Sequence, residues 1–211
     1  MCTFLDKFAI NVALLYGGME IMENKQIKES RKTRYTKMVL RESLMELMKE
    51  KPISIISIKE ICALADISRS TFYTYYQDQY DLLHKTEEDT LEFINKILNK
   101  YMYYKDTISE TLPMMEEILQ YIADNNKSIY VLFSENGDIN FQKTLFKSMY
   151  QKNVLKSLTN NLSDEKTKEY YFLFIVTGSI GLIYHWIKSG MDKPINELAK
   201  LIITITTQIK R

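Results

Sequence analysis

Two short helical patterns separated by a tight turn, between Ser57 and Asp78, constrain the fold of this chain more than any other feature. Ser57 is followed three residues later by Glu60, a capping-box pair that satisfies two backbone N–H groups at the start of a helix. The apolar residues that follow recur at helical spacing, at Ile58, Ile61, Cys62 and Ala65. Asp66 then stands where the chain must turn, and Asp adopts the left-handed conformation more readily than most residues. The pattern therefore predicts a helix that begins at Ser57 and ends at Asp66.

The second helical pattern begins with Ser68 as its N-cap and runs from Arg69 to Tyr76. One face of this helix carries polar side chains, namely Arg69, Ser70, Tyr73, Thr74 and Gln77, and the opposite face carries Phe72, Tyr75 and Tyr76. Such a helix fits the major groove of DNA, where Arg pairs with guanine and hydroxyl groups reach bases or phosphates. The spacing therefore predicts a DNA-binding helix-turn-helix. An ordinary helical hairpin with a polar surface is the alternative.

From about Thr33 to Leu83 the sequence resembles the N-terminal domain of the TetR/AcrR family of bacterial transcriptional regulators. The most specific match starts at Ser68: Ser, two variable residues, Thr, an apolar residue, Tyr, a variable residue and two aromatic residues, followed by a capped helix. The resemblance implies that Thr71 and Tyr73 contact phosphates. It implies that Arg69, Ser70 and Thr74 read bases.

The sequence departs from the family pattern at two positions. Asp66 replaces the usual Gly of the turn, which the backbone tolerates. Gln79 replaces a Lys that binds phosphate at the start of the fourth helix. Gln79 keeps a hydrogen-bond donor beside the helix N-terminus, so we expect a weaker phosphate contact there.

The charge of the chain is concentrated near one end, although its formal net charge is only +1. Seven basic residues and one acid, Glu29, lie in the segment from 25 to 41: Lys25, Lys28, Arg31, Lys32, Arg34, Lys37 and Arg41. A run of this kind is either a solvated face or a DNA contact. Its position directly before the helix-turn-helix favours DNA, and we include Arg34 among the predicted DNA-binding residues.

Three Pro and six Gly in 211 residues, together with long periodic segments, predict an all-α protein. We expect a helix-turn-helix domain at residues 30–78 and a helical dimerisation and effector domain at residues 79–211. Residues 1–22 are an extension that we interpret as an error of the start site, with translation beginning at Met22; a genuine extension is the alternative. The first helix is predicted to end near Lys51, because Pro52 follows, and its apolar side is supplied by Met38, Leu40, Leu44, Leu47 and Met48. Further helices are predicted at about 78–101, 111–124, 127–133, 139–158, 164–189 and 194–209.

The segment Tyr170–Ile187 has no formally charged residue and is apolar enough to raise a transmembrane alternative. Gly178 and Gly181 share one side of this helix and would let another helix approach closely. The final helix carries an apolar stripe that includes Leu198, Ile202 and Ile205. We therefore predict that these five residues line a homodimer interface made by the last two helices, as the resemblance also implies. A membrane-associated protein that uses residues 170–187 is the alternative function.

The sequence offers little for catalysis. His84 and His185 are far apart, no metal-ligand spacing or phosphate-binding Gly loop occurs, and we predict no enzyme activity, cofactor or metal. Cys62, among apolar neighbours, is expected to be a buried thiol of a cytoplasmic protein. The resemblance implies a repressor that binds a palindromic operator and responds to a small-molecule effector, although some members activate. Gly178, Gly181 and Trp186 resemble the branch of dihydroxyacetone-kinase operon regulators, but no pattern identifies the effector or its site.

Overall fold

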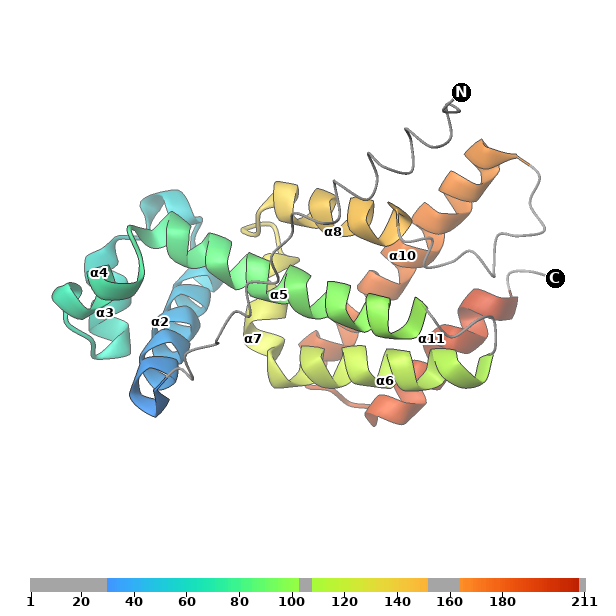
Figure 1. Cartoon of the computed structure of the whole chain (residues 1–211), viewed down its shortest axis with the longest axis horizontal. Coiled ribbons are helices and arrows are strands. Elements are labelled where there is room, and N and C mark those ends of the chain that lie inside the picture. Colours follow the sequence, from blue (N-terminus) through green and yellow to red (C-terminus); the bar gives the residue numbers. More distant parts are fainter. Residues whose placement is uncertain (1–29, 103–107, 152–163, 209–211) are drawn as a thin grey trace, which may run out of the picture. The chain divides into compact units, whose positions relative to one another are not determined.

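The computed structural model describes residues 30–102, 108–151 and 164–208, and within these ranges every regular element is a helix (Figure 1). This confirms the all-α prediction. The extension at residues 1–22, with Met22, and the basic residues Lys25 and Lys28 lie outside the described residues. The elements are α2 (Arg31–Glu50), the 3₁₀ helix η1 (Ile53–Ile55), α3 (Ile58–Ala65), α4 (Arg69–Tyr75), α5 (Gln79–Met102), α6 (Ile108–Asp124), α7 (Asn126–Leu132), α8 (Ile139–Gln151), α10 (Glu165–Lys188) and α11 (Ile195–Gln208).

The caps predicted around the turn are present. The Ser57 hydroxyl accepts a hydrogen bond from the Glu60 N–H at 3.3 Å, and the Glu60 carboxylate accepts one from the Ser57 N–H at 2.9 Å. Asp66 ends α3 in the left-handed conformation, with φ 53° and ψ 43°. The Ser68 hydroxyl accepts a hydrogen bond from the Thr71 N–H at 3.1 Å, as an N-cap should. These local contacts fix the lengths of α3 and α4.

The predicted end of α4 needs a correction. The helix ends at Tyr75, and Tyr76 is extended with φ −139° and ψ 140°. Gln77, which the sequence places on the polar face of this helix, lies in the turn instead, and its backbone N–H donates to Asp81 at 2.9 Å. This contact to the first turn of α5 competes with continuation of α4.

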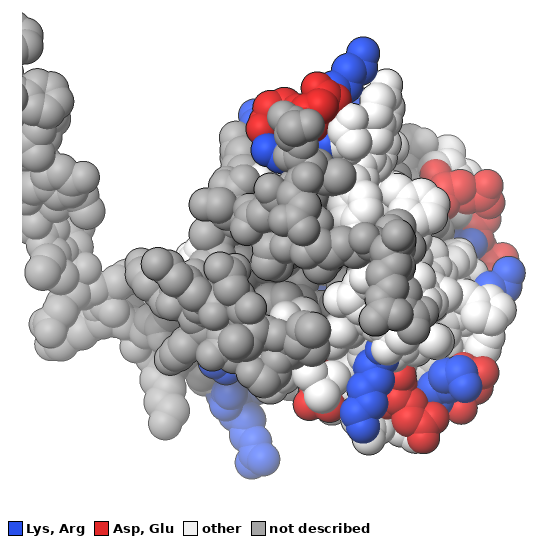
Figure 2. Space-filling view, turned by 90° about the vertical axis from the view of Figure 1, so that its right-hand side faces the viewer, with Lys and Arg blue, Asp and Glu red and all other residues white. Residues whose placement is uncertain are grey.

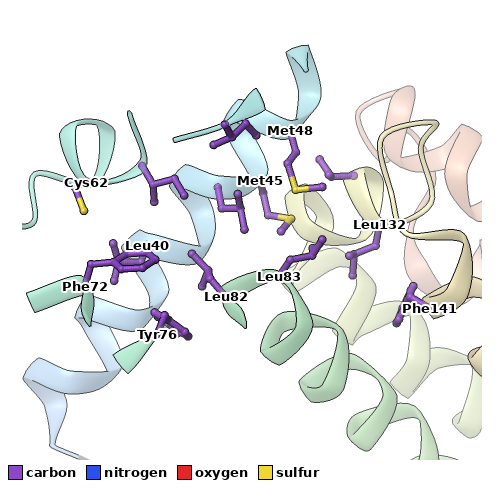
Figure 3. Packing of buried hydrophobic residues seen from close by; sticks show 14 residues of the cluster. Leu40, Met45, Met48, Cys62, Phe72, Tyr76, Leu82, Leu83, Leu132 and Phe141 are labelled. Carbon is purple, nitrogen blue, oxygen red and sulfur yellow. The ribbon is translucent and has the colours of Figure 1, made fainter. Parts of the chain in front are cut away.

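The first hydrophobic core draws residues from α2, α3, α4, α5, α7 and α8 (Figure 3). Its buried members are Leu40, Leu44, Met45, Met48, Ile56, Ile61, Cys62, Phe72, Tyr76, Leu82, Leu83, Val131, Leu132 and Phe141. Met38, which the sequence assigns to the apolar side of α2, is 46% exposed, and Met45 is buried in its place. We call residues 36–76 the head. The core therefore continues from the head into α5, α7 and α8.

The second core lies among α6, α7, α10 and α11, where α11 packs against α6 and α10. Trp186 of α10 is buried here, and its indole N–H donates to the Lys193 carbonyl at 2.9 Å. Leu198 and Ile202 belong to the same core and are 3% and 1% exposed. Their assignment to a dimer interface is therefore corrected, because both side chains are already covered by α11's neighbours within the chain.

Candidate nucleic-acid interface

The orientation of α4 follows from its buried face. Phe72 is fully buried, and its ring centroid lies 5.7 Å from those of both Tyr73 and Tyr76. Because Phe72 is anchored in the core, the opposite side of this two-turn helix must face outward. Arg69, Ser70, Tyr73 and Thr74 are all exposed. The structure thus brings four of the predicted DNA-binding side chains onto one outer face.

The hydroxyl groups of α4 are held by local hydrogen bonds. The Ser68 hydroxyl lies 2.9 Å from that of Ser70 and 2.8 Å from that of Thr71. The Thr74 hydroxyl donates to the Ser70 carbonyl at 3.1 Å. Thr71 is half-buried, whereas Tyr73 is 56% exposed and rests edge-on against Phe72. The phenol group of Tyr73 is therefore open to solvent, while its ring packs against the buried Phe72.

A surface depression lies beside α4, with a volume of about 480 Å³. Its lining residues come from η1 to α5: Ile56, Ser57, Ile58, Lys59, Arg69, Tyr73 and Gln79. Arg69, Tyr73 and Gln79, which the sequence predicts to bind DNA, therefore share one surface. Two cations line it and no carboxylate does, so the depression suits an anionic group such as a phosphate.

Lys59 is the residue of this surface that the sequence analysis does not identify. It is exposed and lies in the first turn of α3, one residue before Glu60 of the capping box. A basic side chain at that place, just after the N-cap, was the available signal. Lys59 supplies a positive charge close to Gln79, where the family pattern would have a Lys.

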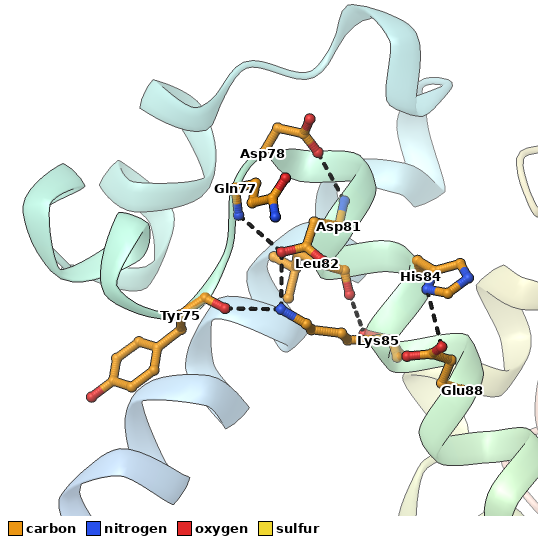
Figure 4. Close-up of polar contacts among 9 residues, drawn as sticks. Tyr75, Gln77, Asp78, Asp81, Leu82, His84, Lys85 and Glu88 are labelled. Atoms are coloured by element: carbon orange, nitrogen blue, oxygen red, sulfur yellow. Dashed lines mark hydrogen bonds and ion pairs between the residues drawn. The ribbon is translucent and has the colours of Figure 1, made fainter.

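The turn between α4 and α5 is fixed by a group of polar contacts (Figure 4). The Asp78 carboxylate accepts the Asp81 N–H at 2.8 Å, and the Asp81 carboxylate accepts the Gln77 N–H at 2.9 Å. Lys85 donates to Asp81 at 3.0 Å and to the Tyr75 carbonyl at 3.1 Å. The Gln77 N–H is the largest cause that lowers the pKa of Asp81. These contacts attach the end of α4 to the first turns of α5.

Two titratable groups of α3 have a structural role. Lys51 donates to the Glu60 carboxylate at 2.6 Å, and this contact, followed by the Ser57 hydrogen bonds, lowers the pKa of Glu60 to about 2. Burial raises the pKa of the Cys62 thiol, so this group stays protonated and packs as an apolar residue.

Arg34 is exposed in the first turns of α2, next to the contact in which Ser30 accepts the Thr33 N–H at 3.1 Å.

An exposed apolar stripe runs along α10. Its exposed positions follow helical spacing: Tyr170, Leu173, Phe174, Thr177, Gly178, Gly181 and His185. The side chains of Tyr170 and Phe174 are 64% and 63% exposed, and a Cβ built on either glycine would meet no atom within 4 Å. Ile205 of α11 is also exposed, at 39%. In the view of Figure 2, side chains of uncharged residues (white) cover part of the visible face, and charged side chains lie at several places around them.

Of the helices in the described ranges, α10 is long and apolar enough to cross a membrane by length and composition. Its best 18-residue window has a mean hydropathy of 1.4 and is 22% buried. The opposite face of the same helix carries Phe172, Ile175, Val176 and Trp186, all buried in the chain. A membrane span would have to withdraw these residues from their present packing, so the composition of α10 alone is weak support for that alternative.

Comparison with known proteins places these features in context. Residues 109–208 match the TetR C-terminal family described as "Transcriptional regulator C-terminal region". The chain is 26% identical over 118 residues to the "Uncharacterized HTH-type transcriptional regulator YxbF" of Bacillus subtilis (strain 168). That match covers 55% of the chain and 30% of the relative, so the chain aligns with about a third of the relative's length.

Solved structures show the same fold at low sequence identity. A putative TetR-family transcriptional regulator from Syntrophomonas wolfei has a TM-score of 0.61 at 16% identity, over 84% of this chain and 95% of that one. The fatty acid degradation regulator FadR from Bacillus halodurans has a TM-score of 0.60 at 10% identity, over 85% and 96%. The dihydroxyacetone kinase operon activator DhaS has a TM-score of 0.52 at 19% identity, over 82% and 95%.

Proposed function

We propose that this chain, whose residues 109–208 match the TetR C-terminal family, is a transcriptional regulator of the TetR type, and that its head binds double-stranded DNA through the outer face of α4 and the depression beside it. The relatives are regulators rather than enzymes, in agreement with the prediction of no catalytic activity. The observation that carries the proposal is the shared surface of Lys59, Arg69, Tyr73 and Gln79. Lys59 of α3 and Arg69 of α4 contribute the cations of this surface, and Tyr73 of α4 also lines it.

We assign different roles to the residues of this surface. Lys59, Tyr73 and Gln79 are proposed to contact phosphates, with Lys59 supplying the charge that Gln79 lacks. Arg69 is in the first turn of α4, from which side chains of recognition helices commonly reach base edges. We propose that Arg69 pairs with a guanine, and that Ser70 and Thr74 contact neighbouring bases.

The experiment begins with selection of a binding site from random duplexes by the wild-type protein, followed by affinity measurements on that site, its single-base variants and unrelated DNA at two salt concentrations. Arg69→Ala should weaken binding to the selected site by about 1–3 kcal/mol and relax preference at one base position per half-site. Lys59→Ala is the matched comparison: it should weaken all sequences alike and reduce the salt slope by about one. If Arg69→Ala also weakens all sequences alike, Arg69 binds a phosphate instead.

Tyr73→Phe tests the phosphate contact without removing the ring. The loss of one hydrogen bond should weaken binding by about 0.5–1.5 kcal/mol, equally on the selected site and on unrelated DNA. Weakening on the selected site alone would assign Tyr73 to base reading. If none of these three variants changes DNA binding, the proposal that this surface is the DNA-binding site is refuted.

We propose that the protein is a homodimer joined through the exposed stripe of α10. The stripe holds apolar side chains at helical spacing, and the two open glycines permit a close approach of a second helix. Ile205 of α11 and the neighbouring Leu201, which is 38% exposed, extend the same kind of surface. A two-fold dimer would present two heads, which matches a palindromic operator. Repression, an effector that controls it and a cytoplasmic location complete the proposal.

The membrane alternative is retained for one observation, the length and mean hydropathy of α10. It makes an opposite prediction about the stripe. In a dimer, the protein expressed from its gene stays in the supernatant after high-speed centrifugation and sediments with twice the monomer mass. In the alternative, it fractionates with membranes and needs detergent for extraction.

A further inference from the structure

The connection between α7 and α8 contacts the head. The Asn136 side chain donates to the Met48 carbonyl near the end of α2, at 2.9 Å. Gly137 approaches the backbone so closely that a Cβ built on it would lie 2.3 Å from the Leu132 oxygen. Asp138 directly precedes α8, and its carboxylate accepts the Asn140 N–H at 2.6 Å. We call Glu87, Asn136, Gly137 and Asp138 the joint.

Glu87 occupies an unfavourable position for a carboxylate. It lies on α5 one turn after Leu83, which is in the first core, and one turn before Leu91, which packs against that core. The residue is only 6% exposed, and its Oε1 atom is buried without a hydrogen-bond partner among the described residues. A buried charge with no partner is strongly unfavourable, whereas a neutral carboxyl at the same place is tolerated far better.

The charged groups around Glu87 do not compensate for its burial. Just before α8, Asp138 carries a like charge that acts on Glu87. From α2, Arg41 pairs with Asp89 rather than with Glu87. From α6, the Tyr121 hydroxyl approaches Thr90 at 3.5 Å, and on α5 itself His84 pairs with Glu88 at 3.4 Å on the exposed side. Burial first and Asp138 second raise the pKa of Glu87 from 4.5 to about 7.

We propose that the joint is a proton-sensitive switch, in which a neutral Glu87 keeps α5 closed on the start of α8 and an ionised Glu87 opens this contact. An ionised carboxylate is driven toward water and away from Asp138, and it separates α5 from α8 as it moves. The neighbouring Leu83, Leu132 and Phe141 share their core with Met45 and Met48 of the head. Opening of the contact between α5 and α8 therefore changes the packing of this core against Met45 and Met48 of the head.

The inference rests on the proposed function where its readout is DNA binding. We expect the closed form to bind DNA, so affinity should fall as the pH rises. If the pKa of Glu87 is about 7 in the closed form and near 4.5 in the open form, linkage limits the fall to about tenfold between pH 6 and pH 8. Well below pH 4.5 both forms hold the proton, so the affinity no longer changes with pH through Glu87.

The test compares the full-length wild type with Glu87→Gln, which is nearly isosteric and stays neutral at every pH. Binding to a duplex selected by the wild type is measured from pH 5.5 to pH 8.5, together with the free energy of unfolding. His84→Gln is the matched control, because it removes the exposed histidine that lies on the same helix and pairs with Glu88. Asp138→Asn keeps the cap of α8 but removes the like charge that faces Glu87.

The switch predicts that the wild type loses up to about tenfold in affinity relative to Glu87→Gln between pH 6 and pH 8. His84→Gln should follow the wild type, and Asp138→Asn should move the midpoint of the transition to lower pH. Between about pH 4.5 and pH 7, the unfolding free energy of the wild type should decline relative to Glu87→Gln, and the difference should stay constant above that range.

Parallel pH profiles of wild type and Glu87→Gln in both measurements would overturn the switch. A difference in unfolding with parallel DNA-binding profiles would also overturn it, because Glu87 would then affect stability alone. If neither protein binds DNA at any pH, the proposed function fails separately. Amide hydrogen exchange at the start of α8, expressed as protection factors that remove the intrinsic pH dependence of exchange, then decides the switch: lower protection at pH 8 in the wild type than in Glu87→Gln supports it, and equal protection overturns it.

Discussion

Phe72 and Tyr73 are adjacent on α4 but have opposite surroundings, so truncating each of them should separate folding from DNA binding. Phe72 is fully buried, with its ring centroid 5.7 Å from that of Tyr76. Phe72→Ala removes most of a core ring and leaves a cavity, and such changes destabilise proteins by about 3–5 kcal/mol. Because domains of this kind are stable by only about 5–15 kcal/mol, the loss should be evident in any denaturation curve.

Tyr73→Ala should behave differently. Its side chain is 56% exposed and touches Phe72 edge-on, with the ring planes at 87°. An aromatic contact of this kind contributes about 0.5–1.5 kcal/mol, which sets the expected loss of stability. The DNA affinity should nevertheless fall at least as far as in Tyr73→Phe, because the phenol group is absent in both variants.

Urea denaturation followed by helical circular dichroism gives the two stabilities, and fluorescence anisotropy with labelled duplex gives the affinities under conditions where both variants are folded. Where α4 keeps its position, the folded fraction of Phe72→Ala should bind DNA with the affinity of the wild type. If Tyr73→Ala destabilises the protein as much as Phe72→Ala, the assignment of an inner and an outer face to α4 is wrong.

Three further substitutions have definite expected outcomes. Asp66→Gly should stabilise the chain by about 0.5–1 kcal/mol in urea, since Gly adopts the left-handed φ of 53° without a Cβ penalty; equal stability of Asp66→Gly and Asp66→Ala would contradict this reasoning. Gly137→Ala should destabilise it by about 1–3 kcal/mol, because the new Cβ would collide with the Leu132 oxygen; a wild-type denaturation curve would show that the connection adjusts freely. Gly178→Leu has open space within the chain, so it should preserve helicity while giving monomers in sedimentation; an intact dimer would remove Gly178 from the interface.

The sequence predicted best those features that depend on neighbours in the chain. The capping box at Ser57, the left-handed Asp66 and the end of α2 before Pro52 follow from contacts within a few residues, and the structure confirms them. The start of α6 was predicted at about Thr111, but the helix begins at Ile108 and contains Pro113. A proline inside a helix removes one hydrogen bond, and α6 tolerates this near its N-terminus.

Features that depend on distant segments were predicted less well. Periodicity shows which residues of a helix are apolar, but it does not show which neighbour covers them. On α2 this led to Met38 in place of Met45, and on α11 it assigned Leu198 and Ile202 to a partner subunit rather than to α6 and α10. Lys59 was missed for the same reason, since its proximity to Arg69 and Gln79 exists only after α3 and α4 have packed.

The first core has a consequence for how regulation of DNA binding can operate. Met45 and Met48 of the head pack in one cluster with Leu83 of α5, Leu132 of α7 and Phe141 of α8 (Figure 3). Protein interiors are packed too densely to deform continuously, so a shift of α7 or α8 is transmitted to α2 or breaks the cluster. The proposed DNA-binding and dimerisation functions therefore lie on either side of the predicted boundary between residues 78 and 79, which does not separate two independent cores. Under the proposed regulation, an effector or the proton on Glu87 would change the presentation of α4 by changing the packing of α5 against α8.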